Sequence, residues 1–137
     1  MTEHEQTLRA FMGEWGKSFA AITAAYRKYL APDAVWEQQP FPTTRTVEEA
    51  IGLLEQFRRQ AGLETFAAEI RHLAVSGDLA FVERTDHLRR ADGSPIISAA
   101  VTGVFEFNGS GQIAAWREYF DSSTVIKAIE AASRKSS

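Results

Sequence analysis

The segment Leu79-Ala-Phe-Val-Glu-Arg-Thr-Asp-His-Leu88 places two charged side chains inside a strand-like apolar pattern. Successive side chains of a strand point to opposite faces, so Arg84 and Asp86 share one face with Val82 and Leu88. Because this face begins and ends in aliphatic residues, we expect it to be buried. Buried charges destabilise a fold unless they are paired. The pattern therefore predicts a functional arginine–aspartate pair, and the alternative is a plain structural ion pair within one strand.

The rest of the chain divides into a helical first half and a strand-rich second half. Two capping boxes, Thr2 with Glu5 and Thr46 with Glu49, precede apolar residues at helical spacing. Three turn clusters rich in Gly, Asp, Asn and Ser separate long strand-like runs. The expected helices cover residues 2–15, 19–30, 46–62 and 122–132, and the expected strands cover 34–39, 63–75, 78–90, 96–107 and 112–120.

This order of elements predicts an α+β fold. The consecutive strands form a curved antiparallel or mixed sheet, which wraps around the N-terminal helices to hide its apolar face. The result is a cone with an internal pocket, formed by a single domain over residues 1–137. The run 96–107 is apolar on both faces, so we expect a homodimer that covers the outer face of the sheet. The alternative is that the C-terminal helix covers this face.

Composition narrows the range of partners. The formal charge of −3 shows no basic patch for nucleic acid, and no apolar run is long enough to span a membrane. The polar, acidic N-terminus does not resemble a targeting segment, so a cytoplasmic location is expected. The absence of cysteine excludes disulfides and thiolate sites. His4, His72 and His87 are scattered, which does not favour a metal site.

A further carboxylate, Asp121, ends the strand-like run Trp116-Arg-Glu-Tyr-Phe-Asp121. It is a candidate partner for Arg84 and Asp86, or alternatively the N-cap of the following helix. Strict alternation groups Asp121 with Arg117 and Tyr119, and a bulge near the end of the strand would change which group faces inward. On the first strand, Trp36 and Gln38 share a face and supply an apolar wall and an amide.

Four stretches together resemble the limonene-1,2-epoxide hydrolase family, within the wider group of SnoaL-like, ketosteroid-isomerase-like and NTF2-like cone folds. The resemblance covers nearly the whole chain. Its motifs are Glu83-Arg-Thr-Asp-His-Leu88, Thr102-Gly-Val-Phe105, Trp116-Arg-Glu-Tyr-Phe-Asp121 and Val35-Trp-Glu-Gln-Gln-Pro-Phe-Pro42.

The resemblance implies hydrolysis of a bulky apolar epoxide to a vicinal diol in one step, without metal, organic cofactor or covalent intermediate. Family members use an Arg-x-Asp strand and an aspartate after a Trp-Arg-x-Tyr-Phe run, which match Arg84, Asp86 and Asp121. Asp86 would then be the general acid and Asp121 the base, with Arg84 bridging them. Gln38 would orient the attacking water.

Trp36 and Leu88 would line the substrate and water site beside Gln38. One departure is that the family holds its water with Tyr-x-Asn on the first strand, where this chain has Trp36-Glu-Gln38. Indole donates a hydrogen bond and cannot accept one. The alternatives are a proton-shuttling isomerase or cyclase, with Tyr26, Tyr29 or Tyr119 as donor, and a non-catalytic small-molecule carrier.

Overall fold

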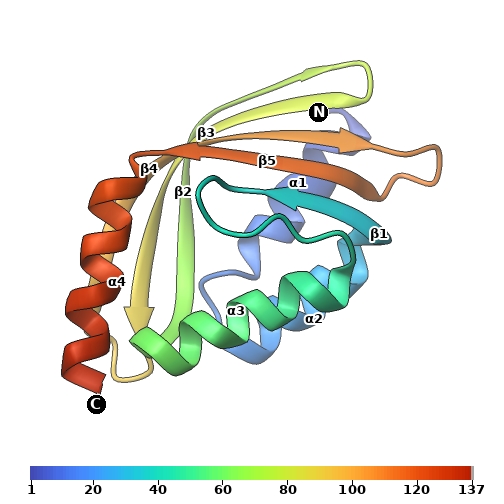
Figure 1. Ribbon diagram of the computed structural model, residues 1–137. Helices are drawn as coiled ribbons and strands as arrows, with labels where there is room; N and C mark the ends of the chain where they lie inside the picture. Colours follow the sequence, from blue (N-terminus) through green and yellow to red (C-terminus); the bar gives the residue numbers. More distant parts are fainter. Residues whose placement is uncertain (137) are drawn as a thin grey trace.

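The computed structural model describes residues 1–136 as four helices and five strands (Figure 1). The helices are α1 (Glu3–Gly13), α2 (Phe19–Tyr29), α3 (Val47–Ala61) and α4 (Ser122–Ser136). The strands are β1 (Leu30–Glu37), β2 (Leu63–Ser76), β3 (Leu79–Arg90), β4 (Pro95–Phe107) and β5 (Ile113–Phe120).

Both predicted capping residues begin helices. Thr2 Oγ1 accepts a hydrogen bond from the backbone N–H of Glu5 at 3.1 Å, and Thr46 Oγ1 accepts one from Glu49 at 3.1 Å. Helix α3 ends at Gly62, whose φ of 76° lies in the left-handed region that glycine adopts without strain. These local signals confirm the predicted starts of α1 and α3.

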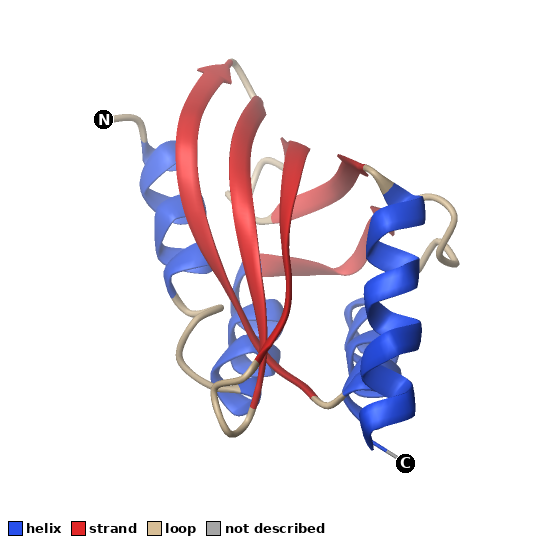
Figure 2. Ribbon diagram, turned by 90° about the vertical axis from the view of Figure 1, so that its left-hand side faces the viewer, coloured by secondary structure: helices blue, strands red, loops and turns tan. Residues whose placement is uncertain are grey.

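The strands form one mixed sheet in the order β1-β5-β4-β3-β2. Strand β1 runs parallel to β5, and the other neighbours are antiparallel. The long strands β2, β3 and β4 bend strongly, and α1, α2 and α3 lie within the curve (Figures 1 and 2). The predicted α+β cone with a curved sheet around the N-terminal helices is confirmed.

Strand β1 begins at Leu30, four residues before the expected start, and runs through Pro32. This is possible because β1 is an edge strand, where the N–H that proline lacks is not needed for pairing. The loop after β1 folds back on it, since Trp36 and Thr44 exchange two backbone hydrogen bonds at 2.9 and 3.0 Å. This return fixes the end of the strand that carries Trp36.

The main core lies between the concave face of the sheet and helices α1 to α3. A second apolar cluster joins Ala99 and Val101 of β4 to Val125 of α4. Since Ala99 and Val101 belong to the concave face, α4 covers that face and not the outer one. The alternative that the last helix covers the outer face is therefore wrong. Helix α4 also extends to Ser136, beyond the predicted end at residue 132.

Candidate functional site

Strand β3 directs Arg84 and Asp86 into the interior, as its alternation predicts. Val82 is fully buried, Arg84 is 1% exposed and Asp86 is 7% exposed. The intervening residues Glu83 and Thr85 lie on the more accessible outer face. The strand thus places a positive and a negative side chain among apolar neighbours.

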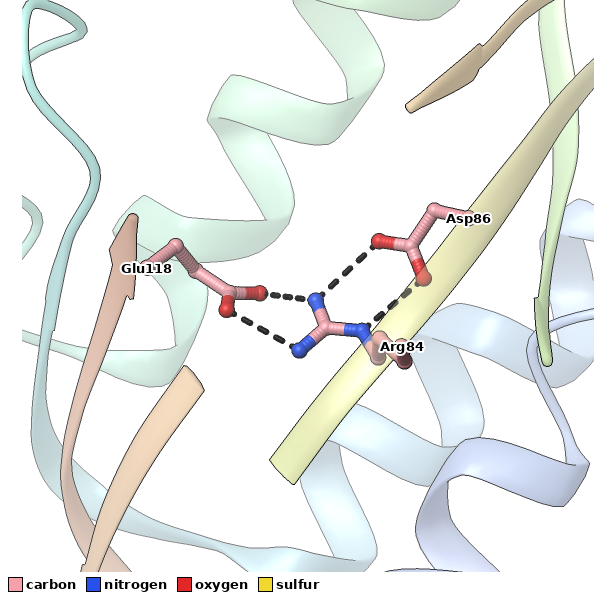
Figure 3. A network of polar contacts seen from close by, with 3 residues as sticks. All are labelled: Arg84, Asp86 and Glu118. Atoms are coloured by element: carbon pink, nitrogen blue, oxygen red, sulfur yellow. Dashed lines mark hydrogen bonds and ion pairs between the residues drawn. The ribbon is translucent and has the colours of Figure 1, made fainter. Parts of the chain in front are cut away.

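Arg84 bridges two carboxylates, Asp86 and Glu118 (Figure 3). Its Nε donates to Asp86 Oδ1 at 2.8 Å, and its Nη2 donates to Asp86 Oδ2 at 3.0 Å. On the other side, Nη1 donates to Glu118 Oε2 at 3.0 Å and Nη2 also donates to Glu118 Oε1. The guanidinium therefore makes a two-pronged contact with each carboxylate, and Nη2 serves both.

Gly103 of β4 makes room for this network. It pairs with Val82 of β3 on one side and with Glu118 of β5 on the other. A Cβ atom at position 103 would lie 2.7 Å from Glu118 Oε2 and 2.9 Å from Arg84 Nη1. The glycine in Thr102-Gly-Val-Phe105 thus opens the passage through which Arg84 reaches across β4.

Aromatic rings pack against the ion-pair network of Arg84, Asp86 and Glu118. The Trp15 ring lies 5.1 Å from the guanidinium carbon of Arg84, a cation–π contact. Trp116 stacks on Trp15, Trp36 and Phe105, with ring centroids 4.9 to 5.6 Å apart. This aromatic packing and the burial of Arg84 and Glu118 restrict their rotamers, so the charged groups are held in place.

Asp121 does not join this cluster. It is exposed and caps α4, accepting hydrogen bonds from Thr124 N at 3.3 Å, Thr124 Oγ1 at 2.8 Å and Ser123 Oγ at 2.9 Å. These bonds, first those from Thr124, lower the pKa of the Asp121 carboxyl. The expectation that Asp121 meets Arg84 and Asp86 is corrected: Glu118 occupies that place, and the N-cap alternative describes Asp121.

A bulge at the beginning of β5 explains the difference. The register between β4 and β5 shifts between the pairs Phe107–Ile113 and Glu106–Ala115. The extra residue lets both Ile113 and Trp116 point inward, and alternation from Trp116 then places Glu118 and Phe120 inward. The sequence signal for Glu118 is its position between the aromatic residues Trp116 and Phe120 at a spacing of two. A similar signal identified Arg84 and Asp86, which lie on one face between the aliphatic residues Val82 and Leu88.

The cluster lies in the wall of a cavity of about 100 Å³. The predicted residues Trp36, Gln38 and Leu88 all line it, so the structure brings them together with Arg84 and Asp86. Its other lining residues are mostly aliphatic or aromatic. They come from helices α2, α3 and α4, from the loops after α1 and β1, and from the sheet: Trp15, Tyr26, Phe41, Leu54, Phe57, Ala61, Leu63, Phe66, Ile96, Ala99, Val101, Trp116, Phe120, Val125 and Ile129. Such a cavity suits an apolar ligand that carries a small polar group.

Burial raises the pKa of both carboxyls. For Asp86, desolvation outweighs the opposing effect of the Arg84 charge and hydrogen bonds. For Glu118, desolvation acts in the same way and the nearby charge of Asp86 adds to it. Burial opposes the charge on Arg84, but the two carboxylates raise its pKa above its usual value. With one cation and two acids in a dry site, a single proton shared between the acids gives a neutral cluster.

Five polar groups of residues that line the cavity have no hydrogen-bond partner among residues 1–136: Trp15 Nε1, Tyr26 Oη, Trp36 Nε1, Gln38 Nε2 and Trp116 Nε1. Buried polar groups are usually paired with protein or ordered water. These groups therefore supply hydrogen-bonding capacity to whatever occupies the cavity.

The part of the chain that the structure describes contains no group of three or more His, Asp or Glu side chains placed to hold a metal ion. None of its helices has the length and apolar character needed to cross a membrane.

Residues 2–131 match the family model of the limonene-1,2-epoxide hydrolase catalytic domain. Among solved structures, an epoxide hydrolase from M. tuberculosis described as similar to that family superposes with a TM-score of 0.72 at 26% identity, covering 95% of this chain and 91% of the other. An NTF2-like protein of unknown function from Burkholderia pseudomallei K96243 has a TM-score of 0.78 at 18% identity, covering 94% and 98%.

A SnoaL-like protein from Jannaschia sp. CCS1, provisionally assigned as a polyketide cyclase, has a TM-score of 0.72 at 19% identity, covering 93% and 92%. The two likenesses below 20% identity show the fold, an NTF2-like cone.

Proposed function

The chain belongs to the limonene-1,2-epoxide hydrolase family, and from this premise we propose that it adds water to an apolar epoxide to give a vicinal diol. The observation that carries the proposal is the bridged pair of buried carboxylates, Asp86 and Glu118, in the wall of an apolar cavity. Opening an epoxide requires a proton for the ring oxygen and a base for the attacking water. Two acids that share one proton supply both.

Asp86 is the general acid and Glu118 the general base in this mechanism. Glu118 removes a proton from water as the water oxygen bonds to an epoxide carbon, and the bond from that carbon to the ring oxygen breaks. Asp86 gives its proton to the ring oxygen, so the product is a diol and no charge accumulates. The proton gained by Glu118 returns to Asp86 by way of solvent, and the cluster regains its starting state.

Arg84 makes the shared protonation possible. Its charge stabilises whichever carboxylate is ionised, and its four hydrogen bonds keep the two carboxylates in fixed positions. Gln38 lines the same cavity with an amide that can orient the water. Trp36, Leu88 and the other apolar residues of the wall bind the hydrocarbon part of the substrate and exclude bulk water.

The experiment is a single turnover of the purified protein with a cyclic terpene epoxide in water enriched in oxygen-18. Label in the diol, with none in the carboxyl groups of Asp86 or Glu118, supports direct attack by water. Label in either protein carboxyl would show a covalent ester and contradict the one-step mechanism. Turnover of an enone or a β,γ-unsaturated ketone without epoxide turnover would favour the isomerase alternative, and binding without any turnover would favour a carrier.

A further inference from the structure

Tyr26 of helix α2 is a fully buried tyrosine whose hydroxyl has no protein partner in the described part of the chain. Its ring packs against Phe11, Trp36 and Trp116, with centroids 5.5 to 5.7 Å apart. Phenylalanine would make the same ring contacts. Burying a hydroxyl without a hydrogen bond destabilises a fold, so packing alone does not account for the phenol.

The hydroxyl belongs to the same cavity as the carboxylates. Tyr26, Asp86 and Glu118 all line it. Burial is the main cause that raises the pKa of Tyr26 well above its usual value, and among the charged groups Glu118 has the largest effect. The phenol therefore stays protonated at neutral pH, and the charge of Glu118 affects its pKa more than that of Asp86 does.

We propose that Tyr26 is a positioning residue for the reaction, and that its hydroxyl holds the attacking water beside Glu118. This inference rests on the proposed hydrolysis. A buried water is stable where it finds two to four polar partners. The unpartnered groups Tyr26 Oη and Gln38 Nε2 and the Glu118 carboxylate belong to residues that line the same cavity, and they provide such partners.

The hydrogen bonds of such a water leave it free to react. It donates one proton to the Glu118 carboxylate and accepts a hydrogen bond from Tyr26 O–H. Its second proton is donated to the amide oxygen of Gln38. A half-turn of the side-chain amide brings this oxygen to the position of Nε2. One lone pair then remains, and it points at the epoxide carbon. Because the Trp36 indole only donates, it cannot take over the role of acceptor for this water.

The test compares Tyr26→Phe with Tyr29→Phe. Tyr29 is a matched control because it lies one turn along α2, also contacts the Phe11 ring at 5.7 Å, and does not line the cavity. Tyr26→Phe is expected to lower kcat about 10- to 100-fold with KM nearly unchanged, since misplaced reactants lose rate of this order. The acid limb of the pH profile of kcat should also move to higher pH, because ionised Glu118 loses its bridge to the phenol. Tyr29→Phe should change neither.

Two results would overturn the inference. One is an unchanged kcat and an unchanged acid limb in Tyr26→Phe. The other is a high-resolution crystal structure of the wild-type protein in which no water bridges Tyr26 Oη and Glu118. The second measurement needs no turnover, so it decides the inference even if the protein hydrolyses no epoxide. Loss of folding is tested by the free energy of unfolding, which should stay close to the wild-type value in Tyr26→Phe because the ring contacts with Phe11, Trp36 and Trp116 are kept.

Discussion

Arg84 organises the site because one guanidinium reaches two acids from different strands. Asp86 lies two residues away on β3, and Glu118 lies on β5, on the other side of β4. Removing either acid leaves the other paired, whereas removing Arg84 would leave two buried carboxylates side by side. The catalytic proposal therefore depends on Asp86 and Glu118 as a coupled pair that titrates as one unit.

Separate substitutions of Glu118 and Asp121 test which residue is the base and which only caps helix α4. Glu118→Gln keeps the shape of the side chain and one oxygen that can accept a hydrogen bond from Arg84. It removes the base, so kcat should fall about 10²- to 10⁴-fold. Asp121→Asn keeps a capping oxygen in a position that is exposed and away from the cavity, so kcat should stay near the wild-type value. Initial rates of diol formation measure both. Full activity in Glu118→Gln together with loss in Asp121→Asn would contradict the assignment.

The pH dependence of stability provides a second test of the same carboxylates. Because the folded-state pKa values of Asp86 and Glu118 are raised, the folded protein binds more protons than the unfolded chain above the usual pKa values. The stabilising contribution of each group is complete below its usual pKa, 3.8 for Asp86 and 4.5 for Glu118, and is lost as pH rises through the folded-state pKa. Denaturant unfolding should show the wild-type free energy of unfolding decreasing, relative to Glu118→Gln, over this range.

Asp121 is a control, because its effect on stability should change with pH in the opposite direction. Its folded-state pKa is lowered, so its contribution is present above its usual pKa and is lost as pH falls. The difference between wild type and Asp121→Asn should therefore shrink toward acid pH. A wild-type stability that rises with pH relative to Glu118→Gln would show that Glu118 is an ordinary ionised partner of Arg84.

Among the elements, strand β4 controls whether β3 and β5 can share a site. Its side chains would separate Arg84 from Glu118, but Gly103 leaves the space in which their atoms meet. Strand β5 contributes Glu118 because the bulge at its start sets the phase of its alternation. Each of these features lies in a single strand, and each determines how residues of different strands meet.

Gly103→Ala tests the gap in β4. The added methyl group would lie under 3.0 Å from both Glu118 Oε2 and Arg84 Nη1, so the ion pair must move. We expect a loss of about 1–3 kcal/mol in the free energy of unfolding, typical of overpacking, and a strong decrease in kcat. Thermal unfolding and initial rates measure the two effects.

Gly52→Ala is the matched control for this substitution. Gly52 lies within helix α3, and nothing lies within 4 Å of the position that its Cβ would take. Alanine is the better helix former by about 1 kcal/mol, so this variant should be as stable as the wild type or more so, with unchanged kcat. Equal effects of the two substitutions would show that Gly103 does not protect the ion pair.

For the whole molecule, the cavity is formed by elements from both ends of the chain. Helices α1 to α3 fill the concave face of the sheet, and α4 covers the part of that face near Ala99 and Val101. The outer face has no such cover in the described structure. There Phe81 is 42% exposed and Tyr119 is 58% exposed, and Phe81 lies opposite Val104.

The predicted homodimer through the outer face can be measured directly. Sedimentation equilibrium should give twice the chain mass of 15.2 kDa at micromolar concentration. Because burying a carboxylate in an apolar contact is unfavourable, the double variant Phe81→Glu, Tyr119→Glu should be monomeric. Its chain should still be folded, as shown by a cooperative unfolding transition. A monomeric wild-type protein at all concentrations would contradict the prediction.

Much of this protein follows from local patterns in its sequence. Capping boxes and apolar spacing determined the starts of α1 and α3, turn clusters separated the strands, and alternation placed Arg84 and Asp86 on the buried face of β3. These features could be predicted because they depend on residues within a few positions of one another. The motif resemblance also identified the family, which the family model confirms.

The identity of the second acid was decided only by tertiary structure. Whether Glu118 or Asp121 faces Arg84 depends on the phase of β5, and that phase is set by a bulge in its pairing with β4. Pairing between strands is a long-range property that no local pattern in β5 encodes alone. The same holds for the space at Gly103 and for the unpaired hydroxyl of Tyr26, since each has meaning only beside residues brought there from distant parts of the chain.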